Sequence, residues 1–161
     1  MSLPWRTATL ALIIATATAF IISLSAQASD PLAGTWELNV AKSKSNNHPL
    51  PKSQTRTYEV AGQQEKMILK GTNAKGMPTS TESTGNRDGK DYPYTDPPRY
   101  ETISVTSVDA LTATYTLKKA GKVVATGTRV ISKDGKEMTL STKGTDAKGQ
   151  PWEADLVFDK R

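Results

Sequence analysis

Residues that commonly carry acid–base or metal chemistry are few in this chain of 161 residues. It contains one histidine, His48, and no cysteine. His48 stands between Asn47 and Pro49 in a polar stretch, which is typical of an exposed loop residue. A cysteine nucleophile, a thiolate metal site and a multi-histidine metal site are therefore excluded.

Carboxylates are more numerous, but their spacing fits no known catalytic or metal site. The stretch from Asn86 to Asp91 weakly resembles a calcium loop, yet aligning its glycine with that motif puts Thr84 and Thr95 where carboxylates are needed. Six acidic residues lie on the expected strands, and most of them alternate to the face opposite the apolar residues, as a solvated surface would: Glu37, Glu59, Glu82, Glu101, Glu153 and Asp155. No Gly-x-Ser-x-Gly motif occurs. We therefore predict a protein that is not an enzyme and has no catalytic residues, metal or cofactor.

Aromatic side chains are the better candidates, because they suit binding rather than catalysis. Tyr92, Tyr94 and Tyr100 gather around the proline-rich stretch 88–99, which we expect to be a long loop. They would either line the rim of a binding site or cap the fold by packing. Other aromatic residues on apolar strand faces would give such a site flat walls, namely Trp36, Tyr58, Tyr115 and Trp152. These seven aromatics form the predicted ligand site.

The elements that would position these residues are β-strands, because apolar and polar residues alternate along most of the chain. Gly34 to Val40 is the first such segment, and Leu111 to Leu117 is the clearest. Short turns with glycine separate the segments, and the stretch 41–53 is expected to be a second long loop. The segment from Thr79 to Arg87 has few apolar residues and is expected to be an edge strand or a wet barrel wall.

The pattern predicts an all-β fold, an antiparallel meander of about eight or nine strands. Such a sheet leaves an edge and a bare apolar face unless it closes into a barrel or folds into a sandwich, and closure removes the edge. The residues expected to face inward are Trp36, Leu38, Val40, Tyr58, Val60, Met67, Leu69, Ile103, Val105, Leu111, Ala113, Tyr115, Leu117, Met138, Leu140, Trp152, Ala154, Leu156 and Phe158.

The N-terminus is typical of a secretory leader. Arg6 precedes an apolar run from Ala8 to Leu24, and the small residues around Gln27 match a signal-peptidase site, so we expect cleavage after Ala28. Residues 1–28 would be the signal peptide and 29–161 a single barrel domain, periplasmic or extracellular, with no stable membrane insertion after cleavage. The formal charge of +5 is carried by scattered lysines, which argues against nucleic acid as a partner.

Three stretches suggest a family. The run GTWELNVAKSKS from Gly34, together with the later DGKDYP and GTRVISKDGK, resembles a group of small exported bacterial proteins of lipocalin-like, calycin-type architecture. The resemblance implies a lipocalin-like barrel in which a late arginine packs on the first-strand Trp36, with Arg129 preferred over Arg161. The chain departs from lipocalins by having no disulfide and no helix pattern before the last strand.

Two functions remain open at this point. One is an exported, non-enzymatic binder of a small apolar ligand held inside the barrel. The other is an envelope structural or protein-interaction module with a filled core, whose partner would be another envelope protein.

Overall fold

The computed structural model describes residues 29–96 and 99–161 and contains eleven β-strands and, within that part of the chain, no α-helix. The strands are β1 (Gly34–Leu38), β2 (Lys44–Asn46), β3 (Ser53–Ala61), β4 (Gln64–Thr72), β5 (Pro78–Asn86), β6 (Asp88–Asp96), β7 (Tyr100–Ser107), β8 (Thr112–Lys119), β9 (Lys122–Ile131), β10 (Glu137–Thr145) and β11 (Pro151–Lys160). The predicted signal peptide and its cleavage site lie outside the described residues. No helix among the described residues is long and apolar enough to cross a membrane.

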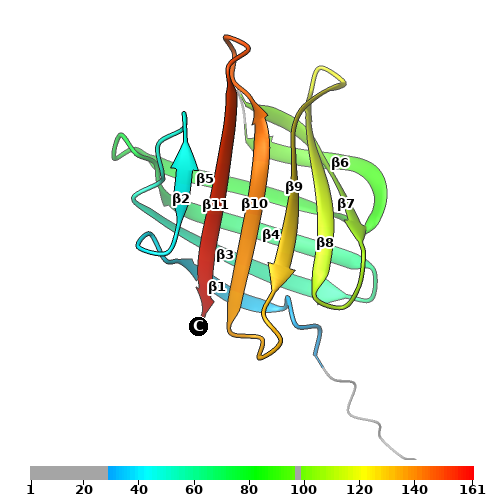
Figure 1. Ribbon diagram of the computed structural model, residues 1–161. Helices are drawn as coiled ribbons and strands as arrows, with labels where there is room; N and C mark the ends of the chain where they lie inside the picture. The colour runs from blue at the N-terminus through cyan, green and yellow to red at the C-terminus, as the bar shows by residue number, and fades with distance from the viewer. Residues whose placement is uncertain (1–28, 97–98) are drawn as a thin grey trace, which may run out of the picture.

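The strands form one closed antiparallel barrel. Each strand from β3 to β11 pairs with the next, β1 pairs with β3, and an additional pairing of β1 with β11 closes the ring (Figure 1). In that closing pair Trp36 lies opposite Lys160 and Leu38 opposite Phe158. The short strand β2 pairs with β11 farther along, where Ser45 lies opposite Ala154. The predicted all-β barrel is confirmed, and the sandwich alternative is wrong because closure leaves no separate second sheet.

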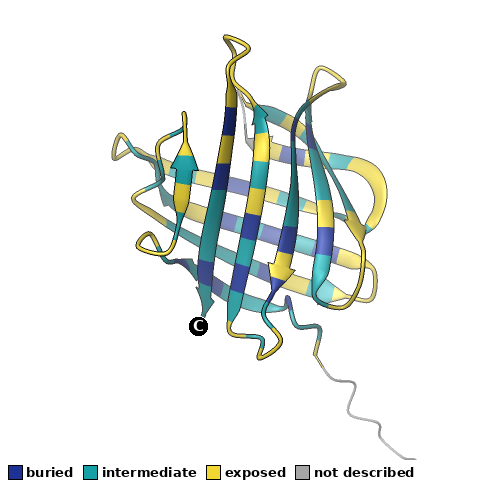
Figure 2. Ribbon diagram, in the orientation of Figure 1, coloured by how far each residue is buried: buried dark blue, intermediate teal, exposed yellow. Residues whose placement is uncertain are grey.

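Side chains alternate between lumen and solvent along the strands, as the coloured bands of Figure 2 show. The tightest packing is at the end of the barrel that carries the C-terminus, where Trp36, Phe158 and Met138 are fully buried. Leu32, just before β1, is also fully buried and accepts a hydrogen bond from Nε1 of Trp36 at 2.8 Å. The segment before β1 thus seals this end of the barrel.

The expected inward set is confirmed except for one member. Val40 is 41% exposed. Strand β1 ends at Leu38, and the carbonyl of Val40 accepts a turn hydrogen bond from the amide of Ser43. Once the chain leaves the strand, the period-two rule no longer fixes which way a side chain points.

The predicted long loop over 88–99 is wrong, because Asp88–Asp96 forms β6. Prolines are tolerated in this strand because its pairing is irregular on both sides. On one side the ladder with β7 has register shifts around the pair of Pro93 and Thr102. On the other, β6 has one registered pair with β5, Tyr94 opposite Ser83, supplemented by bonds of 2.9 Å between the Thr95 hydroxyl and the backbone of Glu82. Pro97 and Pro98 lie outside the described residues.

One loop prediction needs correction, and for one strand the barrel-wall alternative is confirmed over the edge strand. Strand β2 interrupts the predicted loop 41–53, where Ser45 donates a hydrogen bond to the Glu153 carbonyl at 2.9 Å. The segment from Thr79 to Arg87 is not an edge strand, because β5 lies between β4 and β6 in the closed ring. Its hydroxyl residues are wall positions of the barrel, and Thr81 is buried.

The predicted packing of Arg129 on Trp36 is also wrong. Lys160, the cross-strand neighbour of Trp36, places its Nζ 4.9 Å from the centre of the Trp36 ring system. Arg129 instead lies over the ring of Tyr58 at 5.3 Å. The last strand therefore supplies the cation over the first-strand tryptophan, from the position directly opposite it.

Candidate functional site

The barrel encloses a cavity of about 200 Å³. Its lining includes residues 48–51, the turn residues Asn73 and Ala74, and Arg99. The segment that follows β2 and the turn between β4 and β5 lie at the end of the barrel away from the C-terminus (Figure 1), so the cavity reaches the end opposite the sealed one. Apolar strand residues form much of the wall: Met67, Leu69, Ile103, Val105, Leu117, Leu140, Ala154 and Leu156.

Most of the predicted aromatic site residues line this cavity. They are Tyr58, Tyr92, Tyr94, Tyr100, Tyr115 and Trp152. Tyr94 and Tyr100 contact edge to face, with ring centres 6.2 Å apart, where β6 joins β7. Trp36 does not line the cavity, because it is buried in the sealed end. Its assignment to the ligand wall is therefore wrong.

Glycines on neighbouring strands allow aromatic rings to lie flat against the wall. A Cβ atom built on Gly127 would lie 2.3 Å from Tyr115, its cross-strand partner, and one on Gly85 would lie 2.3 Å from Tyr92. The ring of Trp152 similarly approaches Gly144. The missing side chains give the rings room beside the strands. The space in the middle of the barrel is left open as a result.

The open end is covered partly by the segment that follows β2. The imidazole of His48 stacks on Trp152 with ring centres 5.1 Å apart, and Pro49, Leu50 and Pro51 continue the lining. Burial and the nearby positive charge of Arg99 hold the pKa of His48 below its usual value. His48 is thus half-buried at the mouth, whereas the sequence predicted an exposed loop residue.

An ion pair that the sequence analysis missed lies in the wall. Arg129 donates two hydrogen bonds to the carboxylate oxygens of Glu65, each 2.7 Å long, and both side chains are buried. Desolvation is the largest single influence on the pKa of Arg129 and lowers it, but the hydrogen bonds to Glu65, its negative charge and the Tyr58 side chain together raise the pKa above its usual value. Glu65 lies two residues before Met67 and four before Leu69, so its strand parity was a signal that it faces inward.

A second arginine of the lumen has a different environment. Arg56 on β3 lines the cavity beside Gln54, whose Oε1 accepts a bond from Arg56 Nε at 3.0 Å. Its guanidinium lies over the ring of Phe158 at 5.4 Å. No carboxylate among the described residues lies within ion-pair distance of Arg56. The sequence analysis did not select this residue, although it shares the strand parity of Tyr58.

The arrangement suits non-covalent binding. No cluster of three or more histidines and carboxylates that could hold a metal ion occurs among the described residues. The lining holds hydroxyls, but among its described residues the one imidazole is stacked on Trp152 and the one carboxylate is fully engaged by Arg129. Neither group is positioned as a base to activate a hydroxyl.

Comparisons with known proteins do not assign this chain to a family. No family model matches the chain, and no curated protein matches its sequence. Several solved structures are similar to this chain at low identity. They include the zebrafish ileal bile acid-binding protein complexed with cholic acid, at 10% identity and a TM-score of 0.49, with 81% of this chain and 99% of that chain covered.

The bovine odorant-binding protein complexed with its natural ligand is another, at 14% identity and a TM-score of 0.48, covering 84% of this chain and 74% of that chain. Lobster apocrustacyanin A1 matches at 14% identity and a TM-score of 0.45, over 83% of this chain. The match spans 63% of the crustacyanin chain. These likenesses concern the fold alone, and membership of the small exported bacterial family stays a prediction.

Proposed function

We propose that this protein is a non-enzymatic carrier that binds one small molecule with an apolar body inside the barrel. The observation that carries the proposal is the cavity of about 200 Å³, which reaches one barrel end and is walled by aromatic and aliphatic side chains. An apolar cavity of roughly 150 Å³ is enough to hold benzene in another protein. A molecule somewhat larger than one aromatic ring is therefore the size class expected here.

The cavity favours this function over an envelope module with a filled core. The inward residues are numerous enough to fill a small barrel, but rings such as those of Tyr115 and Tyr92 lie against glycines of the wall. A structural module has no need for such open space, because an unfilled cavity lowers the stability of a protein core.

Export remains part of the proposal. The charged start, apolar run and small-residue site of residues 1–28 support removal of a leader and a periplasmic or extracellular site of action. The intact mass of the protein isolated from its own host tests this, with residues 29–161 expected. A mass that includes Met1 would contradict export by a cleaved leader.

Isothermal titration calorimetry with uncharged compounds tests the binding function. Naphthalene, indole and decanol supply apolar bodies of different shape, and at least one is expected to bind with a dissociation constant below about 1 mM. If none of them binds in that range, the carrier function is wrong and the interaction module becomes the better interpretation.

Two variants of one strand place the binding inside the barrel. Ala154→Phe fills part of the cavity and is expected to weaken binding at least about tenfold, whereas Glu153→Phe adds the same ring to the exposed face of β11. The Glu153→Phe variant should bind like the unchanged protein. If both variants lose affinity equally, or if neither variant loses affinity, the ligand binds outside the cavity.

A further inference from the structure

The charged side chains of the cavity lining are unbalanced. Among the described residues that line it are Arg56, Arg87, Arg99 and Arg129, against one carboxylate, Glu65. That carboxylate is occupied by both terminal nitrogens of Arg129. Arg87 is neutralised by Asp30 at 2.8 Å. Of the arginines on the strands that form the wall, Arg56 is the one left without a carboxylate.

Arg56 remains a cation in this position. Burial lowers the pKa of its guanidinium, but the nearby Tyr58 and Tyr94 side chains raise it by more. A guanidinium does not deprotonate in proteins, so it cannot avoid the cost of burial by losing its charge. Burying a cation without a partner costs several kcal/mol in general, and proteins usually place a counter-charge beside it.

The geometry leaves room for a counter-charge that the protein does not supply. Nε of Arg56 donates a hydrogen bond to Gln54 and its guanidinium also interacts with the Tyr58 side chain, but no carboxylate among the described residues pairs with it. Arg56 lines the cavity and is only partly buried, so its guanidinium is within reach of a molecule held there. A carboxylate accepts two parallel bonds from this planar fork.

We propose that Arg56 binds an acidic group of the ligand, so that the carrier takes small molecules with an apolar body and one negative charge. The inference rests on the proposed function and names its ligand class. The Glu65–Arg129 pair is the internal comparison, since it shows what a partnered arginine looks like in the same wall. The ligand's acidic group would take at Arg56 the place that Glu65 has at Arg129.

The test compares naphthoic acid with its uncharged amide, naphthamide, by calorimetry on the purified protein. The two compounds share shape and apolar surface, so their affinity difference reports on the charge. A hydrogen-bonded charge pair of this kind predicts that naphthoate binds about 10- to 100-fold more tightly than naphthamide. Arg56→Met should abolish that preference, so that the variant binds naphthoate no more tightly than naphthamide.

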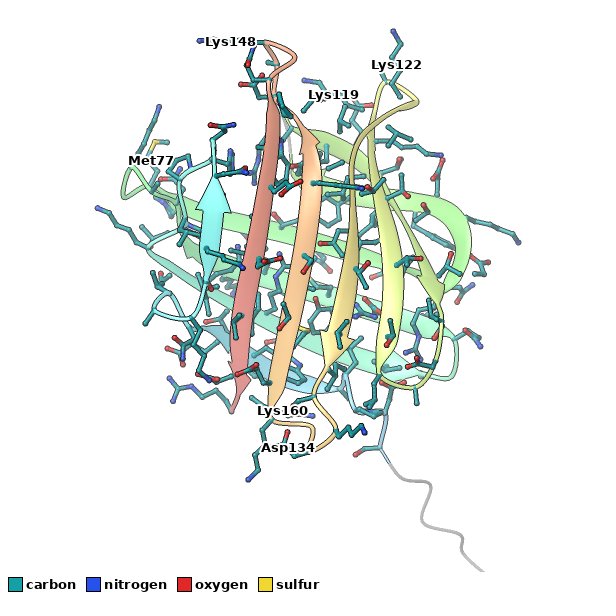
Figure 3. The ribbon with its side chains drawn as sticks, in the orientation of Figure 1. Met77, Lys119, Lys122, Asp134, Lys148 and Lys160 are labelled. Carbon is teal, nitrogen blue, oxygen red and sulfur yellow. The ribbon has the colours of Figure 1, made fainter. Side chains whose placement is uncertain are left out.

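Two further variants sharpen the result. Lys119→Met removes an exposed cation at the open end of the barrel (Figure 3) and should keep the full preference. Arg56→Lys keeps the positive charge but lacks the planar guanidinium, and should retain part of the preference for naphthoate. If Arg56→Met does not fold, the Arg56 Nε–H resonance of the unchanged protein serves instead, because naphthoate should shift it and naphthamide should not.

The failures are distinguishable. If both compounds bind equally, Arg56 is not an anion site, although the carrier function stands. If naphthoate is preferred and Arg56→Met keeps the preference, another cation holds the acid and the assignment is overturned. If neither compound binds, both the proposed carrier function and the assignment of an acidic ligand are wrong.

Discussion

The buried Glu65–Arg129 pair gives the sharpest prediction for stability. Glu65→Gln keeps the shape of the side chain and removes its charge. The guanidinium of Arg129, a residue that is 6% exposed, then has no carboxylate partner. Breaking one partner of a buried pair typically costs about 3–5 kcal/mol in the free energy of unfolding. Because both side chains line the cavity, water reaches them in part, and we expect a loss near the lower end, about 3 kcal/mol.

Urea unfolding followed by circular dichroism measures this loss, and the chain offers a matched control. Glu82→Gln is the same chemical change in an exposed pair, where Lys66 lies 3.8 Å away and the Glu82 side chain is 58% exposed. Its cost should stay below about 1 kcal/mol. A loss for Glu65→Gln no larger than that for Glu82→Gln would refute the reasoning. Replacing both partners, as Glu65→Leu with Arg129→Met, should recover much of the loss.

Three other predictions follow from the same barrel. Trp36→Ala empties the fully buried position at the sealed end and should cost about 3–5 kcal/mol, and an unchanged denaturation midpoint would contradict this. Arg56→Met should leave the ligand-free protein at least as stable as the unchanged protein, because a cation without a carboxylate partner is removed. A loss of more than about 1 kcal/mol in the free energy of unfolding would contradict this. The pKa of His48 is held below 6.5, so the unfolded chain takes up the proton first and stability should fall as the pH drops below that value. His48→Gln should lack this part of the decline, and an identical decline in both proteins would show that the stack on Trp152 does not hold the imidazole neutral.

Much of the architecture was predictable because period-two alternation is a direct record of which side of a strand is buried. It located the strands, the fully buried Trp36 and most of the aromatic lining, such as Tyr58 and Tyr115. The alternation pattern does not reveal the strand over 88–99, because the prolines of this stretch argue for a loop. Pro93 lies instead in a ladder that is irregular on both sides.

The charged part of the site was harder to predict for a physical reason. Glu65 and Arg129 have the strand parity of core residues, but a single sequence does not show which distant charge will meet which. Their pairing depends on the closed ring, which brings β4 and β9 to face one lumen. The lack of a carboxylate partner at Arg56 is harder still to predict from the sequence, because it depends on a partner that the chain does not supply.

The central claim is that the barrel carries a small molecule, and native mass spectrometry of the protein purified from its own host tests it most directly. The account predicts a non-covalent adduct of low mass that is lost on denaturation, is recovered as an acid and is absent from the Ala154→Phe variant. A bare polypeptide mass in every preparation, with no uptake of added naphthoate or naphthamide, would contradict it.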